Sequence, residues 1–146
     1  SPHEMQRYLS KISGPLLDRI DIHIEVTPVP FEKLSEEQKA ESSVEIRKRV
    51  TAAREIQTER FVQMENIHYN AQMNTKHIRE YCVLDDVSKQ LLKTAMERLN
   101  LSARAYDRIL KVARTIADLE ASPKVISSHI AEAIQYRSLD RDGWLG

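Results

Sequence analysis

Apolar residues recur at helical spacing through most of the chain after residue 41. Ser42 can cap the first of these helices, because Glu45 stands three residues further on and can reach back to the cap. The predicted apolar stripe of this helix is weak at Gln57. It otherwise comprises Ile46, Val50, Ala53 and Phe61.

Three stronger helical patterns follow a loop predicted at residues 65–75, where asparagine is frequent. Asp85 can cap a helix whose buried stripe comprises Val87, Leu91, Leu92, Ala95 and Leu99. Ser102 can cap the next helix, which extends to about Leu119 with the stripe Tyr106, Ile109, Leu110, Ala113, Ile116 and Ala117. The last predicted helix begins at Ser127 and ends near Arg137, with Ile130, Ala131 and Ile134 directed inward.

The first 30 residues have a different pattern. A short helix is predicted at Met5–Ile12, followed by a break at Ser13–Pro15. Residues Ile22–Val26 alternate at strand period, and a single strand is not stable without a partner. The sequence therefore predicts a mainly α helical bundle, preceded by a remnant of an α/β domain. The predicted division is 1–30, a linker at 31–43, and a helical region at 44–146.

Composition narrows the function classes. The 146 residues carry 22 Lys and Arg against 22 Asp and Glu, which excludes a strongly basic nucleic-acid binder. Only three glycines are present, and the chain contains neither of the glycine-rich phosphate-binding motifs, G-x-x-x-x-G-K-[ST] or G-x-G-x-x-G. Cys82 is the only cysteine, which favours a reducing compartment, and no apolar run approaches the roughly 20 residues of a membrane helix. The chain begins with Ser1, which suggests a fragment of a longer cytoplasmic protein.

One helix face gathers cations. Arg104, Arg108, Lys111 and Thr115 fall within about 60° of one another on the helix from Ser102, opposite its apolar stripe. The face is either an ordinary solvated surface or a cationic ridge directed at a phosphate or a nucleic-acid backbone. Spacing alone does not decide between the two interpretations.

No catalytic or metal-binding pattern is evident. The five histidines show no i, i+4 pairing and no nearby cysteine, so no zinc site is expected. Asp85 and Asp86 are typical of a helix start, and Cys82 is expected to pack in the interior.

Two long motifs resemble a known family. "RYLSKISGPLLDRIDIHIEV" at Arg7–Val26 and "LSARAYDRILKVARTIADLE" at Leu101–Glu120 resemble the C-terminal part of AAA+ ATPases, most closely the magnesium-chelatase-like family and its ComM/YifB group. The ending "HIAEAIQYRSLDR" at His129–Arg141 is similar to the close of the same family. The resemblance implies that residues 1–30 end the ATPase core, that Ile22–Val26 is its last strand, and that the later helices form the lid.

The resemblance also assigns roles to two arginines. Arg19, in "LLDRID", matches a candidate arginine finger that reaches the nucleotide of the neighbouring subunit in a ring; a salt bridge to Asp18 or Asp21 is the alternative. Arg104, in "SAR", matches the sensor-2 arginine of the lid. Arginine suits both roles, because its planar, permanently charged fork pairs with phosphate oxygens.

The expected whole protein is a ring-forming ATPase that uses ATP and Mg²⁺, with DNA as a further partner and no membrane. Arg108 and Lys111 would line a subunit boundary or contact DNA. The fragment alone is not expected to hydrolyse ATP, and no magnesium-insertion reaction is assigned. The alternative is a stand-alone helical module that binds DNA or a protein through the basic helix face.

Overall fold

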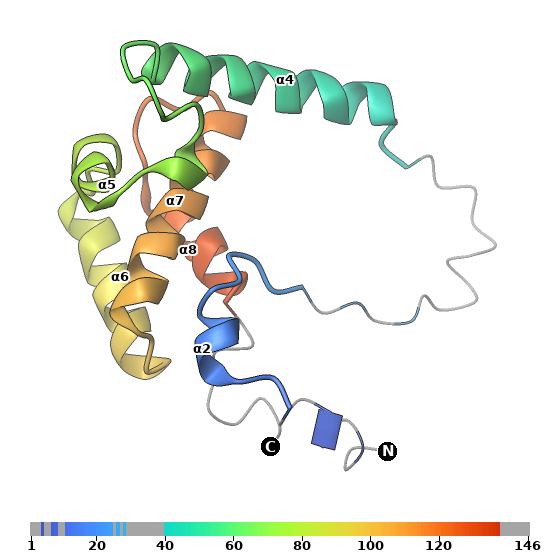
Figure 1. The fold of residues 1–146 in the computed structure, drawn as a ribbon, viewed down its shortest axis with the longest axis vertical. Coiled ribbons are helices and arrows are strands. Elements are labelled where there is room, and N and C mark those ends of the chain that lie inside the picture. Colours follow the sequence, from blue (N-terminus) through green and yellow to red (C-terminus); the bar gives the residue numbers. More distant parts are fainter. Residues whose placement is uncertain are drawn as a thin grey trace.

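The fold is mainly α, as predicted. The computed structural model describes residues 4, 7–8, 11–24, 26, 28 and 40–137. Within them the elements are α2 (Gly14–Leu17), α4 (Ser43–Arg60), the 3-10 helix η1 (Asn70–Gln72), α5 (Thr75–Tyr81), α6 (Asp86–Arg98), α7 (Ala103–Leu119) and α8 (Ser127–Gln135). Figure 1 shows α4 lying across one end of the bundle formed by the later helices.

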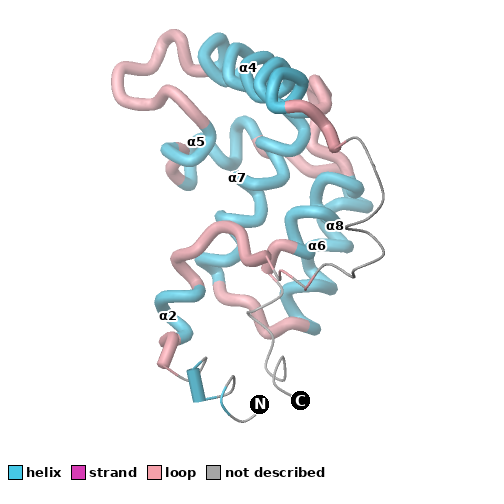
Figure 2. Tube along the Cα trace, turned by 90° about the vertical axis from the view of Figure 1, so that its right-hand side faces the viewer, coloured by secondary structure: helices cyan, strands magenta, loops and turns pink. Residues whose placement is uncertain are grey.

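α7 is the central helix. It contacts α4, η1, α5 and α8, and α6 packs against α8 (Figure 2). Its predicted stripe is largely correct, because the buried apolar residues of α7 are Ala105, Ile109, Leu110, Ala113, Ile116 and Ala117. Tyr106 is the exception at 41% exposed. Burying this stripe is the main stabilising contribution of the helix, at roughly 1.5–3 kcal/mol for each large side chain.

The predicted N-caps are confirmed for three helices. The Ser42 hydroxyl accepts a hydrogen bond from the Glu45 backbone N–H at 3.3 Å. Asp85 Oδ1 accepts from the Ser88 N–H at 2.7 Å, and Ser102 Oγ accepts from the Ala105 N–H at 3.1 Å. The start of each helix is therefore fixed by the residue that the sequence indicates.

The predicted stripe of α4 is wrong over its first half. Ile46 and Val50 are 42% and 47% exposed, because burial of this helix begins only at Ala53. Gln57, predicted as the weak position, is buried, and its Oε1 accepts the Asn70 backbone N–H at 3.0 Å. A polar side chain is tolerated at this core position because its oxygen is hydrogen-bonded.

The helical region differs from the sequence analysis at two further points. Val87 is 67% exposed and therefore does not belong to the buried stripe of α6. The second point is α5, a helix that the sequence analysis does not predict. Its N-cap is Asn74, whose Oδ1 accepts from the N–H groups of Lys76 and His77, at 3.0 and 3.2 Å.

The N-terminal segment differs from its prediction at two points. Gly14 and Pro15, predicted to break a helix, are instead the first two residues of α2. Proline is tolerated in the first turn of a helix. No strand forms among the described residues of 22–28, where no neighbouring strand offers a pairing edge. Half of the helix predicted at Met5–Ile12 lies outside the described residues. Of the other four residues, Arg7 and Tyr8 are helical, whereas Lys11 and Ile12 lie in a turn and a bend.

Candidate functional site

The turn after α2 is held against the end of α8. Arg137 Nη1 donates to the backbone oxygen of Ile20, and Arg137 Nη2 lies 3.9 Å from Asp18 Oδ1. The backbone N–H of His23 donates to the oxygen of Tyr136 at 2.7 Å. Residues 18–23 therefore form a docked turn on the helical region.

The same turn also contacts α7. Asp21 accepts a hydrogen bond from Arg108 in an ion pair that joins residues 87 positions apart. Arg108 lies one helical turn, about 6 Å of rise, after Arg104. The ion pair therefore brings the turn that carries Arg19 next to the helix that carries Arg104.

Arg19 is exposed and forms no ion pair within the described part of the chain. Asp18 and Asp21, the partners considered in its alternative interpretation, lie instead against Arg137 and Arg108. Because the neighbouring carboxylates are engaged, Arg19 can be directed at a group outside the described residues.

Arg104 is also exposed and has no side-chain partner among the described residues. It is the second residue of α7, whose first turn contains no acidic side chain. A cation at the positive end of a helix dipole is unfavourable by about 0.3–1 kcal/mol. Arg104 therefore does not stabilise its own helix, and the exposed N-terminal end of α7 is electropositive.

The other two cations of the predicted ridge are engaged within the chain. Lys111 Nζ donates to the backbone oxygen of Ala71 at 2.9 Å, and Arg108 pairs with Asp21. Thr115 is half-buried and hydrogen-bonded to Asn70 at 3.0 Å. Of the three basic residues, Arg104 alone has no hydrogen-bond or ion-pair partner in the described part of the chain, so the face is not a row of three free cations.

A buried ionic network, not predicted from the sequence, fixes α4 against α7. The Asp118 carboxylate is fully buried and accepts from both Nη atoms of Arg60, at 2.8 and 2.5 Å, from Asn70 Nδ2 at 2.8 Å, and from Arg114 Nε at 3.1 Å. Arg114 also donates to the backbone oxygens of Ser122 and Pro123, and its burial lowers the pKa of its guanidinium. The network holds α4 against α7, the helix that carries Arg104.

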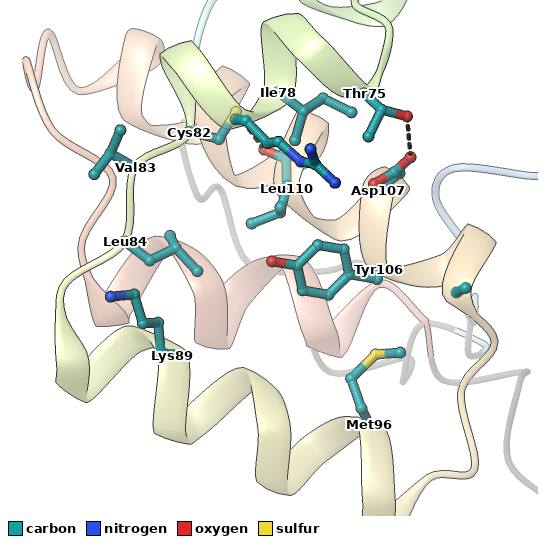
Figure 3. Close-up of a pocket in the computed structure, with 12 residues that line it drawn as sticks. Thr75, Ile78, Cys82, Val83, Leu84, Lys89, Met96, Tyr106, Asp107 and Leu110 are labelled. Atoms are coloured by element: carbon teal, nitrogen blue, oxygen red, sulfur yellow. Dashed lines mark hydrogen bonds between the residues drawn. The ribbon is translucent and has the colours of Figure 1, made fainter.

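A groove of about 770 Å³ opens between α5, α6 and α7 (Figure 3). Its lining is mostly apolar, and Thr75 donates to Asp107 across it at 3.4 Å. Burial raises the pKa of the Cys82 thiol to about 11, so this lining residue is protonated at neutral pH and is a poor nucleophile. Cys82 therefore gives the groove no reactive thiolate at neutral pH.

Among the described residues, no three His, Cys, Asp or Glu side chains come together as potential metal ligands. None of the described helices is both long and apolar enough to span a bilayer.

The family is shown by comparison with known proteins. Residues 40–137 match the family described as magnesium chelatase, subunit ChlI C-terminal, and residues 1–34 match the family described as magnesium chelatase, subunit ChlI. The chain belongs to the magnesium chelatase ChlI family. The resemblance inferred from the sequence motifs is thereby confirmed, and the mainly α fold agrees with the helical C-terminal domain of this family.

Individual relatives support the same assignment. The chain is 43% identical over 142 residues to the competence protein ComM of Haemophilus influenzae, 41% identical to YifB of Salmonella typhimurium, and 39% identical to YifB of Escherichia coli K12. Each alignment covers 97% of this chain and 27% of the relative. The chain thus spans about a quarter of the length of these relatives.

Proposed function

We propose that the chain is the lid-containing C-terminal part of a ring-forming AAA+ ATPase that acts as a DNA-remodelling motor in the cytoplasm. In this proposal residues 1–30 end the ATPase core, residues 31–43 form the linker, and residues 44–146 form the lid region. Membership of the magnesium chelatase family and similarity to a protein named for competence support it. The network of Asp118 provides the rigid support that a lid requires.

In this proposal Arg19 is the arginine finger and Arg104 is the sensor-2 residue. The observation that carries it is the Asp21–Arg108 ion pair, which brings the turn of Arg19 next to the helix of Arg104. Both arginines are exposed and unpaired within the described residues, while the cations around them are engaged. Two free guanidiniums on neighbouring segments suit contacts to phosphate oxygens.

The two arginines would act at different stages. Arg19 would stabilise negative charge that develops on the transferring phosphoryl group in the adjacent subunit. Arg104 would hold the phosphates of bound nucleotide and so link the position of the lid to nucleotide state. ATP and Mg²⁺ would be held mainly by a phosphate loop outside this chain, because its three glycines cannot form one.

The test uses the full-length ATPase that contains this chain. Arg19→Ala should reduce kcat by about 10³-fold or more and leave ATP affinity within a few-fold, because the finger acts in the transition state. Arg104→Ala should weaken ATP binding by about tenfold or more, since a charge-assisted hydrogen bond contributes roughly 1.5–3 kcal/mol. Arg98→Ala, an exposed arginine in the last turn of α6, is the matched control and should change neither quantity.

A mixing experiment tests whether Arg19 acts across a subunit boundary. Subunits carrying Arg19→Ala, combined with subunits whose phosphate loop is disabled, should regain part of the lost turnover, because each defect lies on a different side of the shared site. Unchanged turnover in Arg19→Ala, or a lower melting temperature with normal turnover per folded molecule, would contradict the finger assignment.

A further inference from the structure

The side chain of Arg137 is among the most deeply buried in the described part of the chain, at 1% exposed. A guanidinium remains charged at physiological pH, and burying it is unfavourable unless it is paired and hydrogen-bonded. Two of the groups that it contacts lie far away in the sequence, in the turn after α2. They are the carbonyl oxygen of Ile20, 117 residues earlier, and the carboxylate of Asp18.

These contacts flank Arg19. Asp18 precedes it and Ile20 follows it, so Arg137 contacts the residue on either side of the candidate finger. The backbone of His23 is bound to Tyr136 at 2.7 Å, which adds a second attachment immediately beside the first. The Asp18 carboxylate before Arg19 and the Ile20 backbone after it therefore both contact Arg137 beyond the end of α8, while the Arg19 side chain remains exposed.

The turn is also attached to the helix that carries Arg104. Asp21 pairs with Arg108 on α7, and α7 packs directly against α8. A displacement of these two helices relative to the rest of the ATPase core would therefore carry the turn with it. The position of Arg19 is coupled by these contacts to the position of the lid.

We propose that Arg137 is a positioning residue for Arg19, which fixes the direction of the finger and makes it follow the movement of the lid. This inference rests on the proposed role of Arg19 as the finger. Arg137 itself touches no substrate in this scheme. It acts through the carboxylate of Asp18 and the backbone of Ile20.

A purely structural role for Arg137 would have a different signature. If Arg137 only anchored the end of α8, its loss would lower stability and would reduce turnover whether or not Arg19 is present. If it positions Arg19, its loss should reduce turnover only while Arg19 is there to be misplaced.

The experiment is a double-mutant cycle in the full-length ATPase, with turnover expressed per folded molecule. Arg137→Met should lower kcat by about 10–100-fold, the cost typical of a misplaced catalytic group, and leave KM within about threefold. In an Arg19→Ala background, Arg137→Met should cause no further loss of kcat. Arg137→Lys should recover part of the activity, because an ammonium can still donate to the Ile20 oxygen. Arg98→Met is the matched control and should retain normal kcat and KM.

The outcomes separate the inference from the function on which it rests. A large loss in Arg19→Ala together with normal kcat in Arg137→Met overturns the positioning role and leaves the finger in place. Equal losses from Arg137→Met in both backgrounds also overturn it, in favour of a structural role. Normal turnover in Arg19→Ala removes the finger assignment and the positioning role with it.

Discussion

Asp118 is the residue whose removal should destabilise the helical region most clearly. Its carboxylate is fully buried and accepts hydrogen bonds from Arg60, Arg114 and Asn70. Asp118→Ala would leave two guanidiniums without their carboxylate, in side chains that are only 12% and 4% exposed. Removing one partner of a buried ion pair typically costs about 3–5 kcal/mol, because the remaining charge stays buried.

The expected loss lies at the lower end of that range. Arg60 keeps a hydrogen bond to Asn70 Oδ1 at 2.8 Å, and Arg114 keeps its bonds to the backbone oxygens of Ser122 and Pro123. We therefore expect Asp118→Ala to lower the free energy of unfolding by about 3 kcal/mol. For a domain of this size the melting temperature should fall by about 10 °C.

Urea unfolding followed by circular dichroism measures this loss directly. The matched control is Asp107→Ala on the same helix, because Asp107 is only partly buried and accepts a long hydrogen bond of 3.4 Å from Thr75. The control should change the free energy of unfolding by about 0.5 kcal/mol or less. A loss below about 1 kcal/mol in Asp118→Ala, with an unchanged urea slope, would refute the network as a major source of stability.

Three further predictions concern the chain itself. Burial raises the pKa of Cys82 from 9.0 to about 11, so the folded state keeps this proton to higher pH than the unfolded state does. The free energy of unfolding should therefore fall between pH 9 and 11, by up to about 3 kcal/mol more than in Cys82→Ala. Urea unfolding at each pH measures the difference. Ala121 follows α7 with φ of 52°, so Ala121→Gly should raise the free energy of unfolding by about 0.5–1 kcal/mol, and a loss would contradict left-handed strain there. Calorimetry of the 146-residue chain with ATP and Mg²⁺ should detect no tight binding, whereas a micromolar dissociation constant would show that the nucleotide site lies within it.

Sequence periodicity predicts the helices that are fixed by a cap close in sequence or by an apolar stripe. The caps at Ser42, Asp85 and Ser102 and most of the α7 stripe are confirmed, because they depend on residues close in sequence. α5 was missed because it is short and carries no acidic capping partner. Instead His77 Nδ1 accepts the Asn74 backbone N–H at 3.4 Å, an arrangement in which an imidazole replaces the usual carboxylate.

The parts that could not be predicted depend on partners far away in the chain. Asp118 and Arg114 are charged residues on a helix and suggest a solvent-facing surface, but Arg60, 58 residues earlier, allows the carboxylate to be buried. Arg137 lies in a motif used for the family resemblance, yet its attachment to Ile20 has no signal in local spacing. The roles of Arg19 and Arg104 come from the resemblance and stay predictions.

The docked turn at residues 18–23 has a consequence for the order of folding. Its contacts join residues 87 and 117 positions apart, whereas the Arg60–Asp118 contact between α4 and α7 joins residues 58 positions apart. Closing so long a loop costs entropy before any contact forms, so the turn should dock after the bundle has folded. It is held by a few hydrogen bonds and ion pairs, and its apolar residues Ile20 and Ile22 stay 41% and 46% exposed. It should therefore also be the first unit to open in native-state fluctuations. The candidate finger is therefore carried by a segment that can detach and return while the helical scaffold remains intact.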